Sequence, residues 1–121
     1  MSSAPASRPK ILFICAHNIS RSFTAERMFA GSPLYDVKSR GIAREARIRL
    51  TARDLGWADQ IFVMEKEHKD RIMQEHREAL GDKNVVCLFI DDIYQPMSPE
   101  LVAVLRARLE PYLTLPAPPA G

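Results

Sequence analysis

A cysteine and an arginine, Cys15 and Arg21, stand six positions apart near the start of the chain. The apolar run 11–14 (ILFI) leads directly into Cys15 and is typical of a strand buried on both faces. After Arg21, the apolar residues Ala25 and Phe29 recur at helical spacing. The predicted order is therefore strand, short polar loop and helix, with a chemically active side chain at each end of the loop.

This order favours a site for an anion. The loop consists of Ala16, His17, Asn18, Ile19 and Ser20. Because it leads into a helix N-terminus, several backbone N–H groups and the positive end of the helix dipole meet at one point. Arg21 adds a planar donor suited to phosphate oxygens, and the same donors stabilise a thiolate at Cys15. A thiolate in line with a bound phosphate is a nucleophile for phosphoryl transfer.

Neighbouring polar residues suit the same interpretation. Asn tolerates positive φ better than most residues, so Asn18 suits a turn within the loop. Ser20 or Ser22 is predicted to cap the helix, and the Ser22 hydroxyl can also donate to the thiolate. The alternative is that Cys15 is only a small buried hydrophobic residue at the end of a strand.

The stretch from Ile14 to Glu26, ICAHNISRSFTAE, carries a more specific pattern. It resembles the active-site loop of the low-molecular-weight protein tyrosine phosphatases, V-C-x-x-N-x-x-R-S-x-x-A-E. The resemblance implies that Cys15 is the nucleophile and that Arg21 clamps the phosphate. It also implies that Asn18 and Ser22 shape the loop and support the thiolate.

The resemblance extends over residues 10–109, with two departures in the loop. Residues 39–42 (SRGI) resemble the S-A-G-T turn of the family, and residues 58–65 (ADQIFVME) resemble its A-D-x-I-F-V-M-E segment. Ser20 stands where many members have a second Cys, so a disulfide that shields the loop is not available. Phe23 stands where a Pro usually opens the helix.

Two adjacent acids, Asp91 and Asp92, follow the apolar run 84–90 (NVVCLFI). That place is the edge where open α/β sheets bind ligands, and a carboxylic acid there can protonate a leaving oxygen. Repulsion between neighbouring acids favours keeping one of them protonated. By resemblance, Asp92 is the predicted general acid, because Asp92-Ile93-Tyr94 takes the place of an Asp-Pro-Tyr motif. Asp91 is the alternative acid, a simple turn or cap is the alternative role, and Tyr94 either walls the pocket or packs.

Other chemically interesting side chains have plainer interpretations. Five arginines between residues 40 and 53 form either a solvated surface or a rim that steers phosphorylated substrate. They are Arg40, Arg44, Arg47, Arg49 and Arg53. His68 and His76 lack metal-pair spacing and are predicted to be surface or packing residues. Trp57 and Cys87 are predicted to pack in the core.

The elements that position these residues alternate along the chain. Apolar runs predict strands near 10–15, 35–39, 60–64 and 84–90. Helical spacing and capping signals predict helices from Arg21, over 51–57, over 65–80 and from Ser98 to Glu110. Strands that alternate with helices call for an α/β fold, a small doubly wound four-stranded parallel sheet with helices on both faces.

Length and composition limit the function classes. A chain of 121 residues predicts one domain over 10–113, between a disordered arm (1–9) and a disordered tail (114–121). A net charge of +2 is too small to argue for nucleic acid, and no apolar run or signal peptide argues for a membrane. Two cysteines in apolar runs predict free thiols in a reducing compartment, the cytoplasm.

The combined prediction is a phosphomonoester hydrolase that works through a phosphocysteine. Its substrate is a phosphotyrosine protein or a small aryl phosphate, with phosphate as product or inhibitor. No metal or cofactor is expected, because Arg21 and the loop amides supply the positive charge. Three alternatives stay open: an arsenate reductase-like enzyme, a phosphocysteine carrier in a relay, and a non-catalytic phosphate-binding module. The sequence leaves the physiological substrate and the oligomeric state open.

Overall fold

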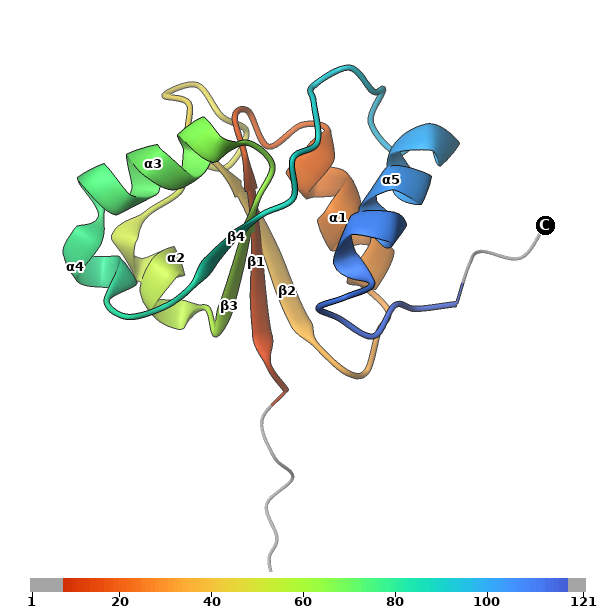
Figure 1. Ribbon diagram of the computed structural model, residues 1–121, viewed down its shortest axis with the longest axis horizontal. Coiled ribbons are helices and arrows are strands. Elements are labelled where there is room, and N and C mark those ends of the chain that lie inside the picture. The colour runs from red at the N-terminus through yellow and green to blue at the C-terminus, as the bar shows by residue number, and fades with distance from the viewer. Residues whose placement is uncertain (1–7, 118–121) are drawn as a thin grey trace, which may run out of the picture.

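The structure, a computed structural model, describes residues 8–117. Its centre is a four-stranded sheet with the strand order β2-β1-β3-β4, in which every pair is parallel (Figure 1). The strands are β1 (Lys10–Cys15), β2 (Asp36–Gly41), β3 (Gln60–Val63) and β4 (Val85–Cys87). The predicted α/β fold with a four-stranded parallel sheet is confirmed.

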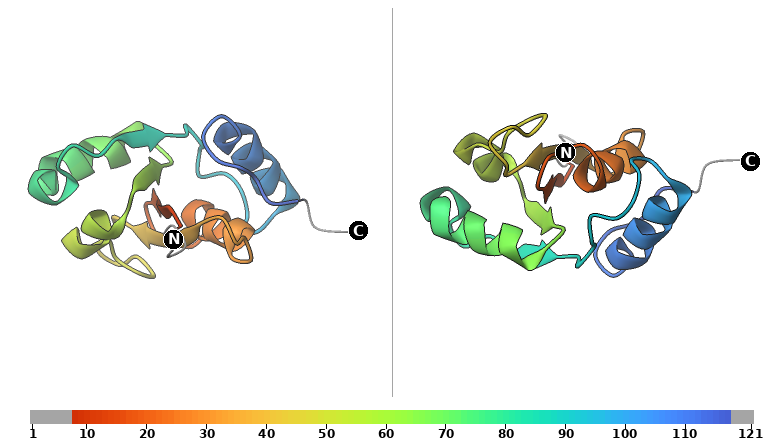
Figure 2. Two further views of the ribbon diagram at one scale, coloured as in Figure 1. Left: turned by 90° about the horizontal axis from the view of Figure 1, so that it is seen from below. Right: turned by 90° about the horizontal axis from the view of Figure 1, so that it is seen from above.

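Helices cover both faces of the sheet, as the views in Figures 1 and 2 agree. Helices α1 (Arg21–Phe29) and α5 (Pro99–Leu109) lie on one face. Helices α2 (Ala52–Trp57), α3 (Lys66–Glu75) and α4 (Arg77–Leu80) lie on the other. The sheet therefore separates two hydrophobic cores.

Alternating side chains of β1 supply both cores. Phe13 faces α1 and α5, and its ring lies 5.8 Å from Phe29 and 5.7 Å from Phe62. Leu12 and Ile14 face the core beneath α2 and α3. A strand buried on both faces explains the unbroken apolar run that precedes Cys15.

Local capping fixes where two of the helices begin. Thr51 and Asp54 form a reciprocal capping box at the start of α2, and Ser98 caps α5 with Pro99 in its first turn. Ser20 precedes α1, but its side chain makes no cap hydrogen bond. Ser22 lies inside the helix. The predicted serine cap of α1 is therefore wrong, because both hydroxyl groups are used elsewhere.

Two predicted elements are shorter in the structure. The helix predicted over 65–80 is interrupted at His76, whose ψ of 34° leaves the helical region, and α4 then packs against α2. The strand predicted over 84–90 ends at Cys87. The backbone N–H groups of Leu88 and Ile90 still donate to the carbonyl oxygens of residues 63 and 64, the last residue of β3 and the one after it. Phe89 between them, however, has a φ of 54°. That left-handed residue breaks the ladder and turns its ring to solvent.

The carboxyl ends of all four strands meet at the upper edge of the sheet in Figure 1. The chain leaves β1 towards β2 on one side and later returns to β3 on the other, so β1 and β3 flank the point where the strand order reverses. Open α/β sheets bind ligands at this point. Cys15 ends β1, directly at the reversal.

The terminal segments are only partly described. Most of the predicted disordered arm (1–9) and part of the predicted tail (114–121) lie outside residues 8–117. Within the tail, the backbone N–H of Thr114 donates to the Tyr35 hydroxyl at 2.9 Å, and Pro116 accepts from Arg106 at 2.8 Å. Among the helices of residues 8–117, none has the length and apolar character needed to cross a membrane.

Candidate active site

The β1–α1 loop (residues 16–20) places a hydroxyl group against the sulfur of Cys15. Cys15 is 3% exposed, and its Sγ lies 2.9 Å from the Oγ of Ser22. The side-chain amide of Asn18 donates to the same Oγ at 2.9 Å. The Ser22 hydroxyl proton has two acceptors within reach, the sulfur at 2.9 Å and the carbonyl oxygen of Arg40 at 3.3 Å. The predicted contact between the Ser22 hydroxyl and the sulfur of Cys15 is present in the structure.

Asn18 also sets the course of the loop. Its φ of 58° lies in the left-handed region, where Asn is among the few tolerated residues with a side chain. The residue is fully buried, so its amide is held inside the turn. The predicted turn at Asn18 is present in the structure.

Arg21 lies at the start of α1 with a guanidinium that is almost completely buried, 2% exposed. Its Nη1 donates to the carboxylate of Glu65 at 2.5 Å and to the carbonyl oxygen of Ile90 at 2.7 Å. Its buried Nε has no hydrogen-bond partner among residues 8–117. The guanidinium is therefore fixed on one side and keeps a donor for an oxyanion on the other.

Glu65 is a site residue that the sequence analysis did not select. It follows β3 at the carboxyl edge of the sheet and precedes α3. The hydrogen bond from Arg21 lowers the pKa of this carboxyl group. An acid directly after a buried strand is the sequence pattern that indicated Asp91 and Asp92, and the same pattern occurs at Glu65.

His68 supports Glu65 from beneath. The backbone N–H of Glu65 donates to Nδ1 of His68 at 3.2 Å, and the ring is 1% exposed. Burial, assisted by the nearby Arg21 charge, lowers the pKa of His68. The cluster of Glu65, Glu67 and His68 offers ligand atoms within 4.8 Å of one another. However, the Nδ1 of His68 already accepts the hydrogen bond from the backbone of Glu65. The ring proton then sits on Nε2, which is unsuited to holding a metal, and His68 packs as predicted.

A pocket of about 210 Å³ opens over the sulfur. It is lined by Cys15, His17, Ile19, Ser20, Arg21, Asp92 and Pro96. The Oδ1 of Asp92 lies 3.7 Å from the Nε of Arg21, and its side chain is 54% exposed. Asp91 is exposed and lies outside the lining. Of the two candidate acids, Asp92 lines the pocket and Asp91 does not.

The β4–α5 connection (residues 88–98) is tied to the loop through its backbone. Ser20 donates its hydroxyl to the carbonyl oxygen of Tyr94 at 3.0 Å. The Tyr94 ring packs against the core on the α1 side, outside the pocket lining. Of its two predicted roles, Tyr94 takes the packing one, and its backbone holds the segment that carries Asp92.

The β2–α2 connection (residues 42–51) braces the other side of the loop. Backbone N–H groups of Ile42, Ala43 and Arg47 donate to the carbonyl oxygens of residues 15, 16 and 17 at 2.9–3.0 Å. The Nε of Arg47 donates to the carbonyl oxygen of Asn18 at 2.9 Å. Its guanidinium lies 4.8 Å from the ring centre of Phe23. Arg47 therefore binds the β1–α1 loop directly, in addition to adding positive charge to the surface. The Phe23 ring packs against its guanidinium.

The remaining candidates lie away from the pocket. Cys87 is partly buried and packs against the core beneath α2 and α3, whereas Cys15 belongs to the core on the opposite face. Trp57 packs against the same core as Cys87, with Lys38 4.3 Å above its ring. His76 is half-buried at the break between α3 and α4.

Fold and site together define a scaffold of the phosphatase type, and comparison with solved structures agrees. The chain is similar to the YwlE arginine phosphatase from Geobacillus stearothermophilus, with 26% identity, a TM-score of 0.59 and 84% of each chain covered. It is similar to a low molecular weight protein tyrosine phosphatase from Streptococcus pyogenes, SP-PTP, with 15% identity and a TM-score of 0.68, over 88% of this chain and 94% of that one.

A third similar structure contains a phosphate analogue. Wzb from Vibrio vulnificus, in complex with benzylphosphonate, is 23% identical, with a TM-score of 0.68, over 88% of this chain and 97% of that one. No family model matches the sequence, and no curated protein matches it. The chain therefore has the fold of the low-molecular-weight tyrosine phosphatases, and the resemblance noted in the sequence is confirmed at the level of the fold.

Proposed function

We propose that the protein is a phosphomonoester hydrolase that acts through a phosphocysteine intermediate. One observation carries this proposal: Cys15, Arg21 and Asp92 line a single pocket at the carboxyl end of β1. A nucleophile, an oxyanion clamp and a proton donor are the groups that metal-free cleavage of a phosphate ester requires.

In the first step, the Cys15 thiolate attacks phosphorus and the bond from phosphorus to the ester oxygen breaks. Arg21 and the backbone N–H groups of the β1–α1 loop bind the phosphoryl oxygens. Asp92 gives its proton to the departing alcohol or phenol. The Ser22 hydroxyl, 2.9 Å from the sulfur, can donate a hydrogen bond to the attacking sulfur.

In the second step, water attacks the phosphocysteine. Asp92, now ionised, accepts a proton from that water, and the bond between phosphorus and sulfur breaks. Inorganic phosphate leaves, and the Cys15 thiolate and the protonated Asp92 are restored. Phosphate is therefore both a product and an expected competitive inhibitor.

The pocket walls support an aryl phosphate, either phosphotyrosine in a protein or a small molecule. Ile19 is 55% exposed, and it and Pro96 line the mouth with apolar surface suited to a flat ring. Arginine phosphatase activity is a second candidate, supported by the similarity to YwlE. Phosphotyrosine and phosphoarginine assayed side by side separate the two substrates. The free thiols of Cys15 and Cys87 support a reducing compartment such as the cytoplasm.

Hydrolysis of an aryl phosphate such as p-nitrophenyl phosphate tests the proposal. Cys15→Ser should lower kcat by roughly 10⁴-fold or more, because the nucleophile is lost. Asp92→Asn should lower kcat by roughly 10²-fold to 10⁴-fold, as loss of a general acid does. Asp91→Asn is the matched control, because Asp91 lies outside the pocket, and it should retain wild-type turnover.

Different outcomes identify the alternatives. Phosphate binding without turnover by the wild-type protein would favour a binding module. A phosphocysteine that persists in the wild-type protein and forms equally well in Asp92→Asn would favour a relay carrier. Arsenite formation that requires Cys87 would favour an arsenate reductase. The position of Cys87 on the opposite core argues against direct exchange between its sulfur and Cys15.

A further inference from the structure

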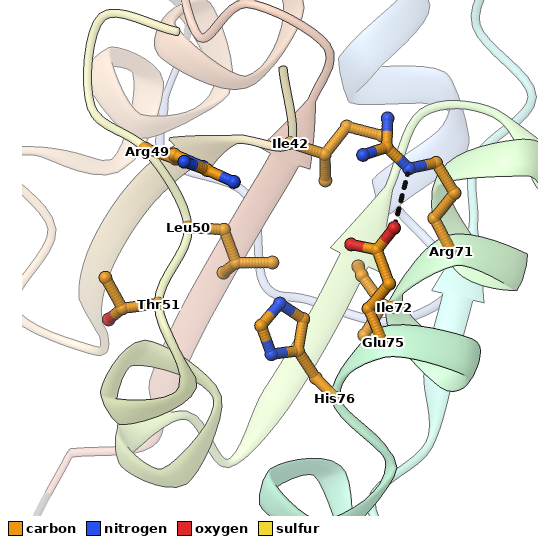
Figure 3. Close-up of a pocket in the computed structure, with 8 residues that line it drawn as sticks. All are labelled: Ile42, Arg49, Leu50, Thr51, Arg71, Ile72, Glu75 and His76. Atoms are coloured by element: carbon orange, nitrogen blue, oxygen red, sulfur yellow. Dashed lines mark ion pairs between the residues drawn. The ribbon is translucent and has the colours of Figure 1, made fainter. Parts of the chain in front are cut away.

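A second pocket lies between the β2–α2 connection and helix α3 (Figure 3). It has a volume of about 270 Å³ and shares no lining residue with the pocket over Cys15. One wall comes from the β2–α2 connection, and the other comes from the C-terminal end of α3 and His76. The proposed phosphatase mechanism gives this pocket no role.

Charged side chains surround the opening and point towards its centre in Figure 3. Arg49 enters from the β2–α2 connection, and Arg71, Glu75 and His76 enter from α3 and the residue after it. The Nε of Arg71 lies 3.4 Å from the carboxylate of Glu75, so these two charges offset one another. Arg49 forms no ion pair within residues 8–117. The opening therefore carries an uncompensated positive charge.

Three of the eight lining residues are apolar. Leu50 and Ile72, which are 6% and 1% exposed, form its floor with Ile42 beside them. A small apolar floor beneath an arginine suits a molecule with a compact hydrocarbon part and one anionic group. The volume limits the ligand to a size near a single substituted ring.

We propose that this pocket is a binding site for a small organic anion, a carboxylate or phosphate attached to a compact apolar body. Arg49 makes the main ionic contact, Arg71 and His76 add donors, and Leu50 and Ile72 contact the apolar part. The proposal concerns binding alone, so it does not depend on the chemistry proposed for Cys15.

Titration with benzoate, followed by amide chemical shifts in NMR spectra, tests the site. A probe this small should bind with a dissociation constant on the order of millimolar. Saturable shifts should concentrate at residues 42, 49–51 and 71–76. Benzamide has the same shape without the charge, and it should bind at least about fivefold more weakly.

Variants with opposite charge changes sharpen the test. Arg49→Ala should weaken benzoate about fivefold, whereas Glu75→Gln should tighten it about threefold, because the opposing carboxylate is gone. Arg53→Ala is the matched control, since Arg53 is exposed nearby on α2 and does not line the pocket. Equal binding of benzoate and benzamide, shifts confined to residues 15–21, or equal effects of Arg49→Ala and Arg53→Ala would each overturn the proposal.

Discussion

At the scale of single residues, the pocket over Cys15 is lined and supported by side chains whose positions are fixed by hydrogen bonds. Ser22 holds its hydroxyl 2.9 Å from the sulfur because Asn18 holds Ser22 in turn. Arg21 is oriented by Glu65 and by the carbonyl oxygen of Ile90. Donors held in place before the reaction need no rearrangement as charge develops, which is the main source of electrostatic stabilisation in such sites.

Arg47 offers a test of this fixed geometry. Arg47→Met keeps the apolar stem but loses the hydrogen bond to the Asn18 carbonyl oxygen and the cation above Phe23. We expect kcat/KM for an aryl phosphate to fall about threefold to tenfold, since one partly buried hydrogen bond is worth about 1 kcal/mol. Steady-state kinetics measure the change.

Arg44→Met is the control, because Arg44 is exposed in the same connection and makes no side-chain hydrogen bond within residues 8–117. If the arginines act only as a steering rim, both variants should lose the same amount, and added salt should remove the difference from wild type. If Arg47 positions the loop, its defect should persist in high salt.

The same residue scale supports a prediction about Glu65. Glu65→Gln keeps an oxygen that can accept from Arg21 but removes the charge that holds the guanidinium. Phosphate affinity and kcat/KM should both fall, by roughly tenfold, because Arg21 is then less firmly oriented. Phosphate binding by calorimetry and steady-state assays measure the two effects. Glu67→Gln, exposed in the first turn of α3, should behave as wild type.

At the scale of elements, the end of β2 lies so close to the β1–α1 loop that no side chain fits between them. A Cβ at Gly41 would lie 2.7 Å from the carbonyl oxygen of Ala16, 3.0 Å from the backbone nitrogen of Asn18 and 2.6 Å from the Cβ of Ala46. Two of these neighbours are backbone atoms of the β1–α1 loop. Glycine is required here by close approach, since a side chain would displace the loop.

Gly41→Ala should therefore damage the site more than the fold. We expect kcat/KM to fall by at least about tenfold, with a loss of stability of about 1–3 kcal/mol from overpacking. Gly31→Ala is the control, because no atom lies within 4 Å of the added Cβ. Activity assays and urea unfolding of both variants measure the two effects. Full activity in Gly41→Ala would show that the loop tolerates displacement.

At the scale of the whole molecule, two ionisable groups with lowered pKa values, His68 and Glu65, link stability to pH. Burial lowers the pKa of His68 below its ordinary value of 6.5, so the folded protein holds the ring neutral. The unfolded chain binds this proton more readily, and stability must therefore fall as the pH drops below about 6.5. The lowered pKa of Glu65 acts in a more acidic window, below its ordinary value of 4.5.

His68→Asn tests this linkage. The amide oxygen of Asn can still accept from the backbone N–H of Glu65, but it does not titrate. The wild-type free energy of unfolding should fall between about pH 7 and pH 5, by at most about 1.4 kcal/mol per pH unit for one proton. The variant should lose part of that slope in urea unfolding at each pH. An unchanged slope would assign the proton uptake to another group.

The sequence by itself determined the local features of this protein. The strand, loop and helix around Cys15, the turn at Asn18 and the caps at Thr51 and Ser98 depend on residues near one another in the chain. Alternation of apolar runs with helical segments was enough to predict the parallel sheet. Periodicity did not reveal the break at His76 or the left-handed Phe89, because each is a single backbone departure within a segment whose residue pattern continues past it.

Only the tertiary structure decided which distant residues complete the site. Glu65 and Ile90 reach Arg21 across 44 and 69 positions of sequence, and Arg47 reaches Asn18 across 29. The same packing brought Asp92 into the pocket and left Asp91 outside it. Parallel strands bring their carboxyl ends to one edge, so these contacts arise from strand order and register and leave no pattern in the local sequence.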